Sequence, residues 1–243
     1  MDPFDADPSQ SKIKNQKSEI EIHRMGKILV LLGAPGAGKG TQARLLQERR
    51  QLPQISTGDI LRAIAETDTP LGREVKEVQN AGRLISDDQV IRVVEERTRQ
   101  EDSKNGYVLD GFPRTPAQAA TLEELARQQG KEIEAVVVDV PLELLTKRAT
   151  GRRSCPVCGE IYNLFFRPPK YDEQCDRHPG VKLEQRGDDT AEKIEVRLKT
   201  YEEQTRPLID YYDESHRLHR VDGTQDPETI YRQIENILEV NGS

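Results

Sequence analysis

The chain has 243 residues, with 36 Lys and Arg against 43 Asp and Glu, a net charge of −7 and three cysteines. This length suffices for one sizeable core with an inserted subdomain, and no apolar stretch approaches the roughly 20 residues of a membrane span. The acidic balance argues against nucleic acid as a partner, and an odd cysteine count without a secretory signal argues for a reducing, cytoplasmic location. We therefore expect a soluble protein whose basic groups gather locally around small anionic ligands.

The first 24 residues are polar, rich in Asp, Ser, Lys and Gln, and lack an apolar stripe that could pack. We expect residues 1–24 to form a disordered leader. Met25-Gly26-Lys27 stands directly before the first apolar run, which suggests a natural start at Met25 behind an added segment.

Short apolar runs alternate with longer amphipathic segments along the rest of the chain. The predicted strands are residues 28–32, 54–56, 107–109, 135–140 and 218–221. The predicted helices are residues 41–50, 59–66, 71–80, 87–100, 116–129, 142–150, 191–213 and 227–240. This alternation predicts an α/β fold, with helices on both faces of a parallel sheet and ligands at the carboxyl ends of its strands.

The first strand is followed by a glycine-dense turn, Gly33-Ala-Pro-Gly-Ala-Gly-Lys-Gly-Thr41. Glycines permit positive φ angles and leave backbone N–H groups open to phosphate oxygens, and the next helix adds its positive N-terminal end. Lys39 fits the lysine of a phosphate-binding loop, although Gly40 separates it from Thr41 where the strict pattern has none. We interpret the turn as a nucleotide site rather than as an ordinary strand-to-helix connection.

Two further strand ends carry polar groups. Ser56-Thr-Gly-Asp59 begins a helix and places Arg62 one turn in, where an ordinary N-cap with a surface arginine is the simpler interpretation. The run 107–114 ends a buried strand with Asp110, as a magnesium-orienting carboxylate does, and Arg114 follows it.

From about Met25 to the C-terminus, the chain resembles the adenylate kinases. The resemblance rests on the order and spacing of five motifs, which are residues 33–41, 56–59, Asp-Gly-Phe-Pro-Arg-Thr at 110–115, Gly-Arg-Arg at 151–153 and Arg-Gly-Asp-Asp at 186–189. It implies one domain, residues 25–243, built as a P-loop three-layer fold with a five-stranded parallel sheet and helices on both faces. Its core would comprise residues 25–55, 86–150 and 190–243, with an AMP-binding insertion at 56–85 and a lid at 151–189.

The resemblance also implies the reaction, a Mg²⁺-dependent and reversible transfer of the terminal phosphoryl group of ATP to AMP that gives two ADP. Such transfer spreads negative charge over oxygens, so the protein mainly positions the reactants and stabilises charge. The implied catalytic residues are Lys39, Arg114, Arg148, Arg152, Arg186 and Arg197. The implied ATP contacts are Gly36, Ala37, Gly38, Lys39, Gly40, Thr41, Arg152, Ile161, Tyr162 and Gln225. Relatives often have lysine where Gln225 stands.

The acceptor nucleotide is assigned in the same way. The implied AMP contacts are Thr57, Arg62, Arg83, Leu84, Ile85, Gly111, Phe112, Pro113, Arg114, Gln118, Arg186 and Arg197. Within this set Gln118 would read the Watson–Crick edge of adenine with its amide. Asp59 and Asp110 would orient Mg²⁺ through water.

Within the lid, Cys155-Pro-Val-Cys158 and Cys175-Asp-Arg-His178 give two metal-binding knuckles. Three thiolates and one imidazole suit a tetrahedral Zn²⁺, and four protein ligands leave no open position, so the ion would be structural. Relatives with zinc usually close the set with Cys or Asp, and Asp176 could compete with His178 as the fourth ligand. Three buried cysteines without a metal are the alternative.

A second class of function is a zinc-ribbon interaction module joined to a nucleotide switch, which would hydrolyse ATP slowly without needing AMP. Another nucleoside monophosphate or small-molecule kinase is the alternative among enzymes. We favour the adenylate kinase interpretation, with ATP, AMP and ADP as partners, neither nucleic acid nor membrane, and a monomeric chain.

Overall fold

The protein is described by a computed structural model that covers residues 26–81 and 83–240. The predicted leader at 1–24 lies outside the described residues. No described helix is long and apolar enough to cross a membrane.

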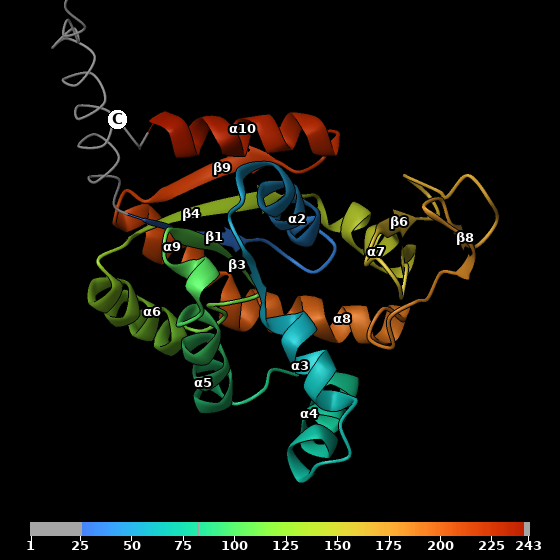
Figure 1. The fold of residues 1–243 in the computed structure, drawn as a ribbon, viewed down its shortest axis with the longest axis horizontal. Coiled ribbons are helices and arrows are strands. Elements are labelled where there is room, and N and C mark those ends of the chain that lie inside the picture. The colour runs from blue at the N-terminus through green and yellow to red at the C-terminus, as the bar shows by residue number, and fades with distance from the viewer. Residues whose placement is uncertain (1–25, 82, 241–243) are drawn as a thin grey trace, which may run out of the picture.

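A parallel sheet forms the centre of the described chain (Figure 1). Its five strands are β1 (Lys27–Leu32), β2 (Gln54–Ser56), β3 (Gly106–Asp110), β4 (Glu132–Asp139) and β9 (Leu218–Asp222), in the order β2-β3-β1-β4-β9. Every neighbouring pair is parallel, so the carboxyl ends of all five strands meet at one edge. The predicted fold class is thereby confirmed.

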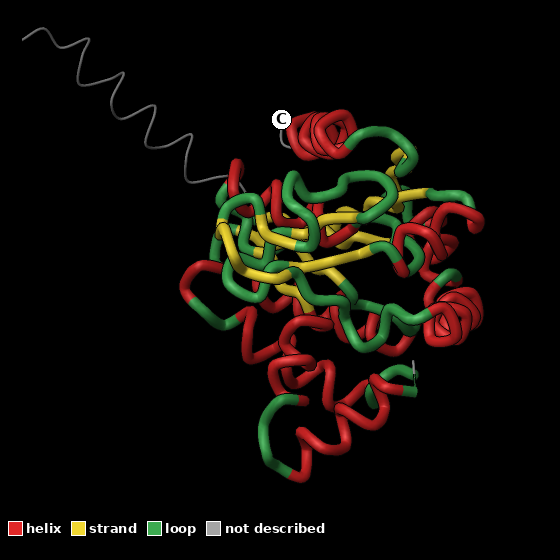
Figure 2. Tube along the Cα trace, turned by 90° about the vertical axis from the view of Figure 1, so that its right-hand side faces the viewer, coloured by secondary structure: helices red, strands yellow, loops and turns green. Residues whose placement is uncertain are grey.

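Helices cover both faces of the sheet (Figure 2). Successive residues of a strand point to opposite faces, and in β1 Val30 joins one apolar cluster while Leu29 and Leu31 join the other. The cluster around Leu29 includes side chains of α2 (Lys39–Arg50), α7 (Leu142–Thr150) and α10 (Pro227–Val240). The cluster around Val30 includes side chains of α3 (Thr57–Ala65), α4 (Pro70–Asn80), α5 (Asp87–Thr98), α6 (Pro116–Gln129) and α9 (Pro207–Glu214).

The predicted helix at 191–213 is wrong as a single element. It consists of α8 (Ala191–Thr200), a π-helical turn η2 (Tyr201–Thr205) and α9, and the N–H of Arg206 donates to the carbonyl of Tyr201 at 2.8 Å. The wider turn displaces the side chains that follow relative to a regular helix.

Two parts of the chain stand out from the sheet and its covering helices (Figure 1). One contains α3 and α4, within the predicted AMP-binding insertion. The other lies within the predicted lid and contains the hairpins β5 (Arg152–Ser154) with β6 (Ile161–Asn163), and β7 (Gln174–Cys175) with β8 (His178–Lys182). A short 3₁₀ turn, η1 (Glu101–Ser103), precedes β3.

Candidate functional site

The glycine-dense turn joins β1 to α2 at the carboxyl edge of the sheet. Gly33 has a φ of +137°, and a Cβ there would meet the Val138 carbonyl oxygen at 2.8 Å, so the turn needs glycine at this position. Gly38 is the N-cap of α2 with a φ of +102°, and no side chain caps the helix. The N–H of Thr41 donates to the Gly38 carbonyl at 3.0 Å, while the first two residues of α2, Lys39 and Gly40, lie at the helix N-terminus, where backbone N–H groups can bind an anion.

Lys39 lies at the centre of this turn. Its Nζ donates to the carbonyl oxygens of Gly33 at 2.6 Å and Ala34 at 3.1 Å. Burial lowers the pKa of Lys39 to about 8, although the charge of Asp110 opposes the shift. A Cβ on Gly40 would stand 3.1 Å from the Asp110 carboxylate, which gives a physical reason for the extra glycine after Lys39.

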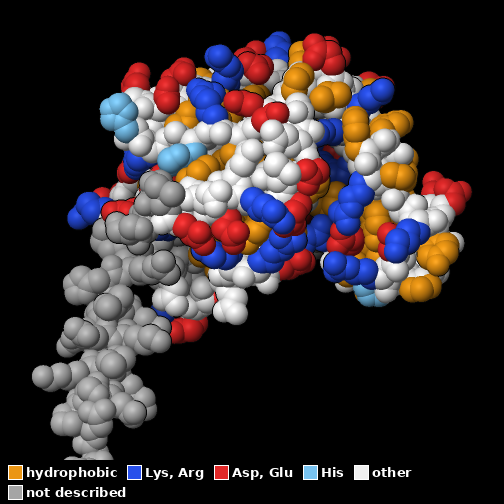
Figure 3. Space-filling view, turned by 90° about the horizontal axis from the view of Figure 1, so that it is seen from above, with side chains coloured by type: hydrophobic (Ala, Val, Ile, Leu, Met, Phe, Trp, Pro, Cys, Tyr) orange, Lys and Arg blue, Asp and Glu red, His pale blue; other side chains and the backbone are white. Residues whose placement is uncertain are grey.

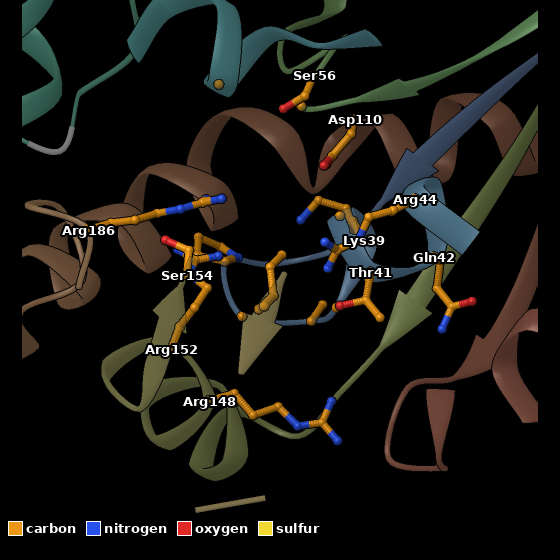
Figure 4. Close-up of a pocket in the computed structure, with 18 of the residues that line it drawn as sticks. Lys39, Thr41, Gln42, Arg44, Ser56, Asp110, Arg148, Arg152, Ser154 and Arg186 are labelled. Carbon is orange, nitrogen blue, oxygen red and sulfur yellow. The ribbon is translucent and has the colours of Figure 1, made fainter. Parts of the chain in front are cut away.

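A large cavity of about 1290 Å³ opens beside the turn. Figure 3 shows a hollow with Lys and Arg side chains along it, and Figure 4 shows Lys39, Thr41 and several arginines facing the cavity. The lining includes all of the predicted ATP-binding residues, which are Gly36, Ala37, Gly38, Lys39, Gly40, Thr41, Arg152, Ile161, Tyr162 and Gln225. Residues almost 190 positions apart in the sequence thus share one cavity.

The predicted catalytic arginines line the same cavity from different elements. Arg148 comes from α7, Arg152 from β5 and Arg197 from α8, and Arg114 and Arg186 from connecting segments. Asp189, whose side chain is fully buried, accepts from Arg152 Nε at 2.7 Å and Nη2 at 2.5 Å and from Arg197 Nη1 at 3.1 Å. One carboxylate therefore fixes two arginines of the cluster.

These arginines repel one another. Burial and, to a smaller extent, the charge of Arg197 together lower the pKa of Arg114 to about 10, although the charge of Asp110 opposes the shift. Burial likewise lowers the pKa of Arg186 to about 10, with Arg152 adding to the shift. Arg152 is the exception, because against the effect of burial its hydrogen bonds to Asp189 raise its pKa. A bound polyanion, such as the phosphate chain of a nucleotide, would stabilise the charges of the arginines whose pKa is lowered.

A smaller cavity of about 70 Å³ adjoins this region. Its lining includes eight predicted AMP-binding residues, which are Thr57, Arg62, Arg83, Leu84, Ile85, Arg114, Gln118 and Arg197. Gly111 and Arg186 line the larger cavity instead. Phe112 and Pro113 belong to neither lining, and Phe112 packs in the core on the α3 side of the sheet.

The two carboxylates predicted to orient magnesium have different surroundings. Asp110 lies at the end of β3, where Gln54 Nε2 donates to its Oδ2 at 3.4 Å. Asp59 forms ion pairs with Arg62 and, at 3.6 Å, with Arg186. Both carboxylates line the large cavity.

The four predicted zinc ligands lie together within the predicted lid. Their ligand atoms are all within 4.8 Å of one another, with Cys158 Sγ 3.8 Å from Cys175 Sγ and Cys175 Sγ 3.6 Å from His178 Nδ1. A tetrahedral Zn²⁺ with normal bond lengths separates its ligand atoms by about 3.6 to 3.8 Å. Among the described residues, the cluster consists of Cys155, Cys158, Cys175 and His178, so His178 is the fourth member. Asp176 is not part of the cluster, and its Oδ1 accepts from the Lys170 N–H at 2.7 Å. The donor set fits zinc.

Sequence reasoning missed several residues at the site. The sequence places Asp189 in the motif at 186–189 but gives it no role of its own. Phe166 lines the large cavity, and the guanidinium carbon of Arg148 lies 5.6 Å from the centre of its ring. Arg44 of α2 reaches the predicted lid, where it donates to the Gly159 carbonyl at 2.8 Å and lies 3.7 Å from the buried carboxylate of Glu160. No local pattern distinguishes these side chains, because their partners are remote in sequence.

A phosphate-binding loop at the carboxyl edge of a parallel sheet, facing an arginine cluster and a second small cavity, defines a P-loop nucleotide-binding protein equipped for phosphoryl transfer. Comparison with known proteins narrows this class. Residues 31–217 match the family model described as adenylate kinase. The chain is 48% identical over 212 residues to an adenylate kinase of Archaeoglobus fulgidus, which covers 87% of this chain and 97% of that protein.

Two other relatives show a similar identity and coverage. An adenylate kinase of Nitrosococcus oceani is 46% identical over 211 residues, covering 86% of this chain and 97% of that protein. An adenylate kinase of Gloeobacter violaceus is 48% identical over 214 residues, covering the same two shares, 86% and 97%. The chain belongs to the adenylate kinase family and is a phosphotransferase.

Proposed function

We propose that this protein transfers the terminal phosphoryl group of ATP to AMP, reversibly and with Mg²⁺, giving two ADP. The observation that carries the proposal is the arrangement of the two cavities. The larger contains the P-loop lysine and the arginine cluster, the smaller contains Gln118, and Arg114 and Arg197 line both. Arginines shared between a donor cavity and an acceptor cavity suit a phosphoryl group that passes from one to the other.

In this proposal the chain acts by positioning and by charge. The α2 amides and Lys39 hold the donor phosphates, while Arg152 and Arg197, fixed by Asp189, face the charge that develops during transfer. A general base is not required. The donor base would lie near Phe166 and Arg148, because an aromatic ring beside a guanidinium offers a flat apolar surface with a positive edge.

Mg²⁺ would be held through water by Asp110 and Asp59, and when bound it neutralises phosphate charge. Asp110 is the better supported of the two, because Asp59 is engaged with Arg62 and Arg186. Zn²⁺ would be held by Cys155, Cys158, Cys175 and His178 and would supply structure only, since the four ligands leave no open position.

We further propose the division into core, AMP-binding insertion and lid given above, a monomeric chain and a cytoplasmic location. The lid proposal is supported by the arginines and metal ligands at 151–189, and the insertion by the cavity lining at 57–62 and 83–85.

A coupled assay tests the function. ADP formed from ATP is measured with AMP, GMP, CMP or UMP as acceptor, with and without Mg²⁺. We expect rapid turnover with AMP in the presence of Mg²⁺. Slow ADP release that does not depend on any monophosphate would instead favour the nucleotide-switch alternative, and preference for another monophosphate would identify a different kinase.

A further inference from the structure

The amide of Gln118 is held at both of its ends. Gln118 is 1% exposed, lies in the first turn of α6 and lines the small cavity. Its Nε2 donates to Asp87 Oδ1 at 2.7 Å, and its Oε1 accepts from the backbone N–H of Arg114 at 2.8 Å.

These two partners determine which end of the amide is which. The backbone N–H of Arg114 can only donate, and the carboxylate oxygen of Asp87 accepts. Turning the amide by 180° would place its NH₂ against the Arg114 N–H and its oxygen against the carboxylate. Both contacts would then be repulsive, so the hydrogen-bond network selects one orientation of Gln118.

Asp87 is itself anchored. Its Oδ2 accepts from Thr115 Oγ1 at 2.9 Å, and Thr115 Oγ1 in turn accepts from the Gln118 N–H at 3.2 Å as the N-cap of α6. Asp87 opens α5, so its carboxylate joins the first turns of two helices. Both of its oxygens are committed, which prevents it from turning to follow Gln118.

After these bonds, the Gln118 amide retains one N–H hydrogen and one lone pair on Oε1. A 6-amino purine such as adenine offers a donor at position 6 and an acceptor at N1, whereas a 6-oxo purine offers an acceptor at position 6 and a donor at N1. A glutamine that rotates freely could pair with either base. A glutamine held in one orientation pairs with only one of them.

We propose that Asp87 is a specificity-determining positioning residue, which holds the Gln118 amide in one orientation and so makes the acceptor pocket select a 6-amino over a 6-oxo purine monophosphate. This inference rests on the proposed function. A site built to form given hydrogen bonds rejects a ligand that leaves its buried polar groups unpaired.

The test compares kcat/KM for AMP and for IMP as acceptors of phosphate from ATP. Asp87→Asn keeps the size of the side chain but can donate as well as accept, so residue 87 no longer favours one orientation of the Gln118 amide and only the Arg114 N–H still opposes the turned one. We expect the AMP-to-IMP ratio of kcat/KM to fall about tenfold, the size expected for weakening a hydrogen bond to a charged group. Asp88→Asn is the matched control, because Asp88 is exposed in the same first turn of α5, and its ratio should stay at the wild-type value.

A double-mutant cycle separates positioning from a structural tie between α5 and α6. Gln118→Ala should lower the AMP-to-IMP ratio by itself, and adding Asp87→Asn should then change the ratio no further. An Asp87→Asn protein that melts like the wild type and keeps its ratio would overturn the proposal. So would an equal loss with both nucleotides, or effects of Asp87→Asn and Gln118→Ala that add. Failure of the wild-type protein to phosphorylate AMP would instead refute the proposed function.

Discussion

Replacing Asp189 by Asn removes one buried charge and places an NH₂ group against arginine donors. Removing one partner of a buried ion pair costs about 3 to 5 kcal/mol. The Arg152 and Arg197 side chains remain 18% and 19% exposed, so water can solvate part of the freed charge. We therefore expect a loss near the lower limit, about 3 kcal/mol. In a domain of this size such a loss lowers the melting temperature by roughly 6 to 12 °C.

Turnover should fall as well, because Arg152 and Arg197 lose the group that orients them. A displacement of about 1 Å at a reacting centre can lower the rate roughly 100-fold. Calorimetry gives the melting temperature, and the coupled assay well below that temperature gives turnover. The control is Asp139→Asn, which removes a carboxylate 3.5 Å from Arg220 in a pair whose side chains are both more than half exposed. It should change stability by less than about 0.5 kcal/mol. An Asp189→Asn protein that melts within about 2 °C of the wild type would refute the reasoning.

Three other outcomes are expected. Lys39→Met should lower turnover by about 10³-fold without lowering the melting temperature. In the wild type, kcat/KM for ATP should decrease as the pH rises through about 8, because Lys39 then loses its charge. A pH profile that stays flat above pH 8 would contradict this second expectation. Cys175→Ala and His178→Ala should lower zinc content and melting temperature together, whereas His178→Asp should keep the metal. If the metal-free protein melts at the same temperature as the zinc-loaded form, the ion is not structural. An analogue that joins both nucleotides should shorten the distance between one label in the proposed lid and one in the core. Closure of adenylate kinase lids over their substrates is a standard example of such motion. Equal label distances with and without the analogue would count against closure.

The helices that could be predicted best carry strong local signals. The predicted bounds of the helices at 116–129, 142–150 and 227–240 agree with the structure. The first and last of these helices begin with proline at the first position, and Pro141 directly precedes the other. Gly130, with a φ of +63°, ends the first of them. The π-helical turn at Tyr201–Thr205 could not be predicted, because a single wide turn scarcely alters the apolar period of a long helix. The sequence analysis does not predict the four strands between residues 152 and 182, because these two- to five-residue segments are rich in polar residues and lack an apolar run.

The site also contains some residues that local sequence patterns predict and others that they do not. The P-loop and the Cys/His knuckles are contiguous or regularly spaced, so their residue types alone indicate their chemistry. The parts played by Asp189 and Asp87 depend on contacts with residues 37 and 31 positions away. Nothing near either aspartate in the sequence predicts its partner. Supporting residues of this kind become visible only when the fold brings the strand ends and helix starts together.

Glu160 connects the proposed lid to α2 of the proposed core, and this contact bears on any movement of the lid. Its side chain is only 7% exposed, and it lies 2.9 Å from Arg167 and 3.6 Å from Arg177, both in the lid, and 3.7 Å from Arg44 of α2. If the lid moves away from α2, the Glu160 carboxylate keeps its ion pairs with Arg167 and Arg177, so it does not become a buried charge without a counter-ion. On the α2 side, such a movement breaks the charge pair of Glu160 with Arg44, whose side chains are 7% and 20% exposed, and the hydrogen bond from Arg44 to the Gly159 carbonyl. Because salt screens a mostly buried pair much less than an exposed one, added salt should change the population of the detached arrangement only slightly.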